Sequence, residues 1–260
     1  MSRHHETFLA FAERLADSAR EMLRAAAAAA EAPRVDLKED ASFVTATDRA
    51  VEARLREMIA DAFPDHGIMG EEHGSDALGA DHVWVLDPID GTAAWVAGIP
   101  VYGTLIGLAE GGRPQLGVIE LPATGERLTG IAGVGAWWNR APIRCRAGTA
   151  LGDAYMTSSN PRFIPTADRA AFERLDAAVR FTQYGGSCYA YGCLARGRTD
   201  LAVDAGFDAY DLFAPAAIIA GAGGVISDWE GADLDLGWNG RVIAAGDKAL
   251  HAEALRLLGR

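Results

Sequence analysis

The stretch Trp84-Val85-Leu86-Asp87-Pro88-Ile89-Asp90-Gly91-Thr92 joins an apolar run to two carboxylates and a Gly-Thr pair. An apolar run broken by Asp-Pro is typical of a buried strand that ends in a turn. Gly91-Thr92 can open a helix, whose first backbone N–H groups have no partner inside the helix. Carboxylates bind hard divalent cations, and free N–H groups bind phosphate. The stretch therefore predicts either metal-assisted chemistry on a phosphate ester or an Asp-rich turn that only caps a helix.

The composition indicates a folded, acidic protein. The chain has 260 residues, of which 50% are hydrophobic, and a formal net charge of −12. This length allows one large domain or two tightly joined halves. The negative charge argues against a nucleic-acid partner that binds a basic surface. An anionic substrate would need metal ions or a local cationic patch to offset this charge.

The sequence predicts a cytoplasmic location and no membrane partner. The first residues, Met1-Ser-Arg-His-His-Glu6, lead into a charged helix and not into the apolar core of a signal peptide. No apolar run approaches the length of a transmembrane helix. Cys145, Cys188 and Cys193 lack the spacing of a metal site, and their odd number favours reduced, mostly buried thiols.

Hydrophobic periodicity predicts two halves of different character, at residues 1–145 and 146–260. In the first half, helices at 5–31 and 49–63, the second capped by Thr47 or Asp48, precede strands at 67–70 and 83–86 and an antiparallel meander over 101–139. In the second half, helices and strands alternate from about residue 150. His66, His73 and His82 are expected in loops or at the surface.

Five acids stand at element ends that could meet in the fold: Asp48, Glu71, Asp87, Asp90 and Asp211. Each alone is explained by capping or solvation, whereas together they match one family pattern. The matching motifs are Val44-Thr-Ala-Thr-Asp48, Gly70-Glu-Glu72, Asp87-Pro-Ile-Asp-Gly-Thr92 and Tyr210-Asp211 with Gly223-Gly224 downstream. With these motifs the whole chain resembles the inositol-monophosphatase-like superfamily of magnesium-dependent, lithium-sensitive phosphatases.

This resemblance implies an α/β fold, an αβαβα sandwich of the sugar phosphatase type, with two to three Mg2+ ions per site and Mn2+ as an alternative. Glu71, Asp87 and the Ile89 carbonyl would hold one ion, and Asp87, Asp90 and Asp211 a second. A third, weaker ion would sit near Glu71. Thr92, hydrogen-bonded to Asp48, would orient the attacking water, and the N–H groups of Gly91 and Thr92 would hold the phosphate. Lys38 could add positive charge or simply be solvated.

The substrate is implied by a second, narrower resemblance. Tyr184-Gly-Gly-Ser-Cys-Tyr-Ala-Tyr191, residues 99–106 and Gly221-Ala-Gly-Gly-Val-Ile-Ser-Asp-Trp229 resemble the histidinol-phosphate phosphatases. Two positions depart from that branch: Ser187 replaces an Asp, and Ala93 replaces a basic residue. Gly186, Ser187 and Asp204 are the expected substrate-binding residues, with Trp95 and Tyr189 either lining the pocket or in the core.

These features leave three functions open. The first expectation is a phosphatase for L-histidinol phosphate, a small phosphorylated metabolite. The alternatives are a phosphatase for inositol 1-phosphate or another polyol or sugar phosphate, and a non-catalytic relative that binds an anion or a partner. The family resemblance also implies a homodimer, for which Trp137-Trp138 would suit the interface or, equally, the core.

Overall fold

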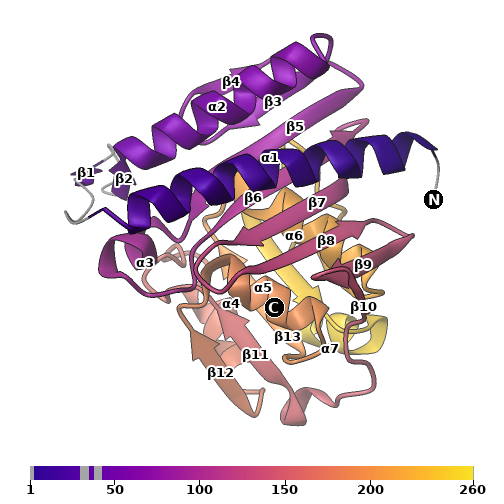
Figure 1. Ribbon diagram of the computed structural model, residues 1–260. Coiled ribbons are helices and arrows are strands. Elements are labelled where there is room, and N and C mark those ends of the chain that lie inside the picture. Colours follow the sequence, from indigo (N-terminus) through magenta and orange to yellow (C-terminus); the bar gives the residue numbers. More distant parts are fainter. Residues whose placement is uncertain (1–2, 30–34, 38–42, 260) are drawn as a thin grey trace.

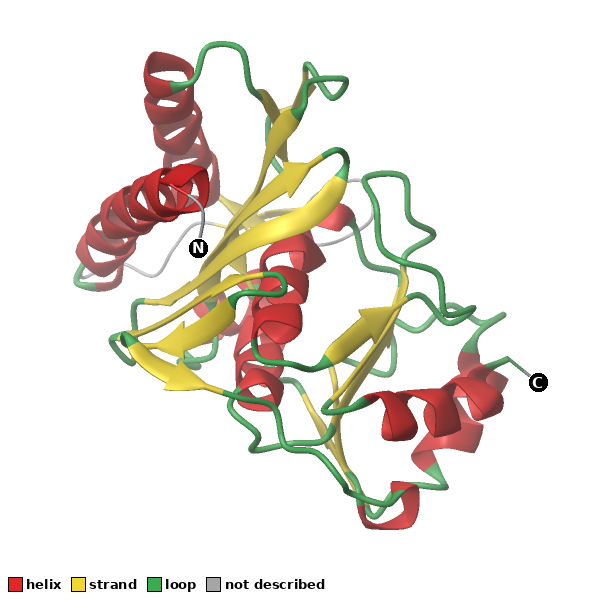
Figure 2. Cartoon of the chain, turned by 90° about the vertical axis from the view of Figure 1, so that its right-hand side faces the viewer, coloured by secondary structure: helices red, strands yellow, loops and turns green. Residues whose placement is uncertain are grey.

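Two β-sheets alternate with three layers of helices through the molecule, as Figure 2 shows. This computed structural model describes residues 3–29, 35–37 and 43–259. From one side to the other, the layers are α1 with α2, the larger sheet, α5 with α6, the smaller sheet, and α4 with α7 (Figure 1). This order confirms the predicted αβαβα sandwich.

The larger sheet has eight strands in the order β10-β9-β8-β7-β6-β5-β3-β4. β3 runs parallel to β5, and every other neighbouring pair in this sheet is antiparallel. The predicted meander is confirmed, while the short edge strands β4 and β10 were not expected. The strands are β3 (Gly67–Gly70), β4 (Gly74–Asp76), β5 (His82–Asp90), β6 (Gly103–Glu110), β7 (Arg113–Leu121), β8 (Glu126–Ile131), β9 (Gly135–Trp138) and β10 (Ala141–Ile143).

Two long helices cover the outer face of this sheet. α1 (Arg3–Ala27) and α2 (Ala46–Ala62) bury one apolar face each, with Leu15 and Leu55 fully buried against Trp84 of β5. α1 ends four residues before the expected position 31. None of the helices in the described ranges is long and apolar enough to cross a membrane.

The start of α2 corrects the predicted cap. Thr45 is the N-cap, because its hydroxyl accepts a hydrogen bond from the Thr47 N–H at 3.2 Å. Asp48, at the third helical position, accepts the Thr45 N–H at 2.9 Å and completes a capping box. Thr45 also ends β2 (Phe43–Thr45), which pairs antiparallel with β1 (Val35–Leu37). Lys38 lies outside the described residues.

The smaller sheet has five strands in the order β12-β11-β13-β15-β14. β11 is parallel to β12 and β13, and β15 is antiparallel to both its neighbours. The predicted alternation of helices and strands is confirmed. The elements are η1 (Leu151–Asp153), β11 (Tyr155–Ser158), α4 (Arg169–Asp176), β12 (Phe181–Tyr184), α5 (Ser187–Ala195), β13 (Leu201–Ala205), α6 (Ala209–Gly221), β14 (Val225–Ser227), β15 (Arg241–Ala245) and α7 (Lys248–Leu258), with α3 (Thr92–Ala97) in the first half.

α6 joins the two sheets because it is apolar on all sides and lies between them. Its close approach to the larger sheet needs glycine: a Cβ on Gly117 would lie 2.2 Å from the Ala214 carbonyl oxygen. Ile119 of the larger sheet and Val242 of the smaller sheet belong to the same core cluster as α6. We therefore propose that residues 1–145 and 146–260 fold together around this helix.

Candidate active site

Three carboxylates converge where β5 ends and α6 begins. One oxygen each from Asp87, Asp90 and Asp211 lies within 4.8 Å of the others. The two aspartates of β5 face the same region because the pairing with β6 is interrupted between Asp87 and Asp90. Asp211 stands in the first turn of α6, where its carboxylate also accepts the Asp208 N–H at 2.7 Å.

The cluster is buried and electrostatically unfavourable by itself. Asp87 is 1% exposed, and its Oδ1 has no hydrogen-bond partner within the described residues. Burial, followed by the charges of Glu71, Asp90 and Asp211, holds the pKa of Asp87 well above its usual range. Burial also raises the pKa of Asp90 to about 6. The pKa of Asp211 is likewise raised well above its usual range by burial. Hard oxygen donors with an unpaired buried oxygen fit a divalent cation such as Mg2+, which would offset their repulsion.

Glu71 joins this cluster from the end of β3. Its carboxyl group lies within hydrogen-bonding reach of Asp87. The turn that carries it is held by Glu52, a fully buried carboxylate of α2 that accepts the Glu72 N–H at 2.7 Å and the His73 N–H at 3.1 Å. Glu52 was not among the residues predicted to support the site. Its signal was a carboxylate next to Val51, on the helix face expected to point inward.

Thr92 lies between the buried Asp48 and the end of β5. The Thr92 hydroxyl is 3.0 Å from the Ile89 carbonyl oxygen and 3.4 Å from Asp48 Oδ1. Asp48 is held by its other oxygen, Oδ2, which accepts hydrogen bonds from the N–H and the hydroxyl of Thr45. Since a hydroxyl carries one hydrogen, Thr92 can donate to only one of these two acceptors at a time.

The start of α5 packs directly on the turn after Asp90. Gly91 has a φ of 77°, and a Cβ on it would lie 2.4 Å from the Ser187 hydroxyl. Ser187 itself has a φ of 46° and follows Gly186. The Cys188 N–H donates to Asp90 Oδ2 at 2.5 Å. The structure thus brings Ser187, which follows Gly186, beside the turn that carries the carboxylates. It also places Cys188 in contact with Asp90, which no local sequence pattern predicted.

Asp204 lies in β13 with both carboxylate oxygens already accepting hydrogen bonds. Oδ1 accepts from the Ser158 hydroxyl and from both the N–H and the hydroxyl of Ser159, and Oδ2 accepts from Tyr191 at 2.7 Å. Its exposed fraction is 1%. Direct contact between Asp204 and a substrate stays a prediction.

Trp95, a candidate for the pocket wall, and Trp138, a candidate for the dimer interface, both pack against other side chains of this chain. Trp95 is buried, with its ring 4.8 Å from that of Tyr102. Trp138 is half-buried under the Arg196 guanidinium, 3.8 Å from its ring centre, and donates to Glu126 at 2.9 Å. Trp138 thus has a packing role in the chain itself.

Cys188 contacts Asp90 of the three-aspartate cluster, whereas none of the histidines among the described residues belongs to this cluster. His66 lies in the loop before β3 and His73 is exposed, as predicted, whereas His82 begins β5 and is half-buried, so the prediction was wrong for His82. The rings of His66 and His82 stack at 4.9 Å. Burial and the neighbouring His82 lower the pKa of His66. Cys145, Cys188 and Cys193 are all free, and Cys188 alone among them is buried, so the prediction of mostly buried thiols was wrong.

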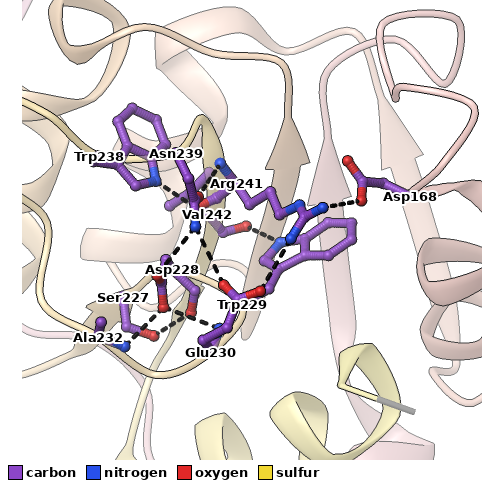
Figure 3. Close-up of polar contacts among 10 residues, drawn as sticks. All are labelled: Asp168, Ser227, Asp228, Trp229, Glu230, Ala232, Trp238, Asn239, Arg241 and Val242. Carbon is purple, nitrogen blue, oxygen red and sulfur yellow. Dashed lines mark hydrogen bonds and ion pairs between the residues drawn. The ribbon is translucent and has the colours of Figure 1, made fainter.

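Asp228 and Trp229 make polar contacts around the turn after β14, which Figure 3 shows. Asp228 Oδ1 accepts the N–H groups of Glu230 and Ala232, which closes the turn after β14. Arg241 forms ion pairs with Asp168 and Glu230 at 2.9 and 3.0 Å. Asp168, Trp229, Glu230 and Arg241 line a cavity of about 640 Å³ between α4 and α7, and none of the clustered carboxylates lines it.

Comparisons with protein families, individual proteins and solved structures find similar proteins over nearly the whole chain. The family model described as "Inositol monophosphatase family" matches residues 4–260. The "Bifunctional phosphatase IMPL2, chloroplastic" of Arabidopsis thaliana is 38% identical over 85% of this chain and 66% of its own length. A "Histidinol-phosphatase" of Mycobacterium tuberculosis is 32% identical over 98% of both chains. The solved structure of an inositol monophosphatase from Zymomonas mobilis is 37% identical, covers 100% of both chains and superposes with a TM-score of 0.89.

Proposed function

This chain belongs to the inositol monophosphatase family and is a phosphoric monoester hydrolase, and we propose that it hydrolyses L-histidinol phosphate to L-histidinol and phosphate. The family is metal-dependent, generally on Mg2+. The observation that carries the proposal is the convergence of Asp87, Asp90 and Asp211, with an unpaired Asp87 oxygen, beside Thr92.

The clustered oxygens would hold two to three cations, Mg2+ or alternatively Mn2+. In this proposal Glu71, Asp87 and the Ile89 carbonyl hold one ion, and Asp87, Asp90 and Asp211 hold another, with Asp87 shared. The raised pKa of Asp87, caused first by burial and then by its acidic neighbours, supports a site that needs positive charge. When bound, the cations supply the charge that acidifies a water nucleophile and neutralises phosphate oxygens.

The chain itself would orient the water and accept its proton. Thr92 stands within 3.4 Å of Asp48, whose second oxygen is fixed by Thr45. A hydroxyl that donates to Asp48 presents its oxygen lone pairs to a water, so Thr92 can pass a proton from that water toward the Asp48 carboxylate. Glu71, at the edge of the cluster, would steady the same water. The N–H groups of Gly91 and Thr92 would hold the phosphate, beside the positive charge of the cations.

The choice of histidinol phosphate rests on similarity to histidinol-phosphatases along most of the chain. Those of Chlorobaculum parvum and Mycobacterium tuberculosis are 33% and 32% identical over 80% and 98% of this chain. In the proposal, Gly186, Ser187 and the acidic Asp204 face the cationic organic part of the substrate. Inositol 1-phosphate is the second candidate, because Ser187 offers a neutral hydroxyl where the histidinol-phosphatase branch usually has an acid.

The experiment compares purified protein on L-histidinol phosphate and inositol 1-phosphate by phosphate release, with Mg2+ and with EDTA. We expect Mg2+-dependent release and a higher kcat/KM for L-histidinol phosphate. The Ser187→Asp variant should widen that preference, because it adds a charge that attracts a cationic substrate and not a polyol. A higher kcat/KM for inositol 1-phosphate would contradict the substrate assignment. Release from neither substrate nor from a wider panel of monoesters would favour a non-catalytic role.

We further propose a cytoplasmic homodimer that acts on a small metabolite. The absence of a disulfide among the three cysteines, all of which lie in the described residues, supports this environment. Light scattering of the purified protein would give a mass of twice 27.5 kDa for a dimer.

A further inference from the structure

We propose that the buried Tyr191–Asp204 pair is a positioning device for the metal-binding carboxylate of Asp90, acting through α5. This inference rests on the proposed function, because it takes Asp90 as a metal ligand. It gives Asp204 a role as an anchor in addition to the substrate contact proposed above.

The first step is the contact between α5 and Asp90. The Cys188 N–H, in the first turn of α5, donates to Asp90 Oδ2 at 2.5 Å. That bond uses one oxygen of Asp90 and fixes the rotation of the carboxylate, which decides where its other oxygen points. The Ser187 hydroxyl fills the space over Gly91 at the same time. The metal-binding turn therefore moves if the start of α5 moves.

The second step is what holds the start of α5. Tyr191 lies three residues after Cys188 in the same helix, and its hydroxyl donates to Asp204 Oδ2 at 2.7 Å. Tyr191 and Asp204 are 4% and 1% exposed, so water cannot replace either partner. Residues three apart on a helix lie on the same face. The Tyr191–Asp204 bond therefore fixes the position of the part of α5 that carries Cys188.

The third step is what holds Asp204. Its Oδ1 accepts hydrogen bonds from Ser159 N–H and Ser159 hydroxyl, both at 2.7 Å, and from the Ser158 hydroxyl at 3.1 Å. Ser158 ends β11, and Asp204 lies in the neighbouring strand β13. The carboxylate is therefore fixed to two strands of the smaller sheet. A continuous chain of hydrogen bonds thus joins the smaller sheet, through α5, to Asp90 on the larger sheet.

Most of the acceptor sites of Asp204 are already used inside the protein. A carboxylate has about four lone-pair sites; Oδ1 of Asp204 receives three hydrogen bonds and Oδ2 receives one. A substrate ammonium or hydroxyl could therefore bond only at the second lone pair of Oδ2, inside a buried site. Mutation of groups that orient the metal ligands without binding the metal typically changes metal affinity or activity by about 10- to 100-fold.

The test measures Mn2+ binding to the metal-free, full-length protein by electron paramagnetic resonance, without substrate. Tyr191→Phe is the informative variant, because it removes the bond to Asp204 and keeps every negative charge. We expect its Kd for Mn2+ to rise by about 10- to 100-fold. Tyr184→Phe is the matched control: it also removes a Tyr–Asp bond, of 3.0 Å to Asp176 on α4, and should leave the Kd within about twofold of wild type.

Steady-state kinetics separate the two roles of Asp204. Positioning predicts that Tyr191→Phe and Asp204→Asn raise the Mg2+ concentration for half-maximal rate, with the substrate KM unchanged at saturating Mg2+. A wild-type Kd for Mn2+ in both variants, with a raised substrate KM, would overturn the positioning role and support direct contact. Ser159→Ala, which retains the Ser159 N–H bond, gives a milder variant if Tyr191→Phe does not fold. A wild-type protein that binds no Mn2+ would overturn the metal site, and the proposed function with it.

Discussion

Replacing Gly91 by alanine should destabilise the protein, because the turn after Asp90 has no room for a Cβ. The added atom would lie 2.4 Å from the Ser187 hydroxyl oxygen and 2.8 Å from Ser187 Cβ. A non-glycine residue in the left-handed region costs about 1–2 kcal/mol, and forcing extra atoms into a packed region costs about 1–3 kcal/mol. Together they lower the free energy of unfolding by about 2–5 kcal/mol. The Ser187 hydroxyl can rotate away, but its Cβ cannot, so the steric part persists.

A double-mutant cycle isolates the steric part of this cost. Urea unfolding in EDTA compares wild type, Gly91→Ala, Ser187→Gly and the double variant. Ser187→Gly removes both atoms that the alanine would meet and relieves the φ of 46° at position 187. In that background Gly91→Ala should cost only the left-handed part, about 1–2 kcal/mol. Equal costs of Gly91→Ala in the two backgrounds, or a loss below about 0.5 kcal/mol in the wild-type background, would refute the close packing of α5 on this turn.

Three further predictions concern charge and burial. In EDTA, raising the pH from 5 to 7 should destabilise wild type relative to Asp90→Asn in urea unfolding, because burial raises the folded pKa of Asp90 to about 6 and its stabilising proton is lost as the pH passes that value. His66 should behave oppositely, because burial lowers its pKa in the folded state below 6.5. Wild type should therefore lose stability relative to His66→Gln as the pH falls below 6.5, since glutamine does not titrate and still accepts the Trp84 N–H. An equal pH dependence of stability in the two proteins would contradict this. Arg127→Met should lower the free energy of unfolding by about 1–3 kcal/mol, because it removes one of the two arginines that pair with the fully buried Glu120 carboxylate, while Arg20 still pairs with it. The double variant with Glu120→Gln should recover much of that loss, and no recovery would argue against the pair.

Features encoded by adjacent residues could be predicted from the sequence. The strand leading to Asp87, the helix that begins at Thr92 and the glycine turn after α6 each depend on local periodicity and turn residues. β4 escaped prediction because Gly-Ser-Asp has no apolar alternation, and it forms only by pairing with β3. The cap of α2 was misplaced because Thr45, Thr47 and Asp48 compete within four residues, and only the capping box decides among them.

The support behind the candidate site could not be predicted, because it depends on contacts between distant parts of the chain. Glu52 lies 20 residues before the Glu72 N–H that it accepts, and Cys188 lies 98 residues after Asp90. Cys188 contributes a backbone N–H, which every residue except proline has, so its identity carried no signal. Asp204 was predicted as a substrate-binding residue, but its four hydrogen bonds come from Ser158 at the end of β11, Ser159 just after it and Tyr191 of α5, and they appear only in the assembled fold.

The central claim is that the buried carboxylates hold the metal for phosphate ester hydrolysis. The direct measurement is phosphate release by Asp90→Asn at saturating Mg2+, beside Asp153→Asn as a control at an exposed aspartate. Asparagine keeps an oxygen for the Cys188 N–H, so circular dichroism should show a folded protein. We predict that Asp90→Asn lowers kcat by more than about 100-fold, beyond the effect of residues that only support ligands, and that Asp153→Asn keeps the wild-type rate. A folded Asp90→Asn protein with the wild-type rate would contradict the account.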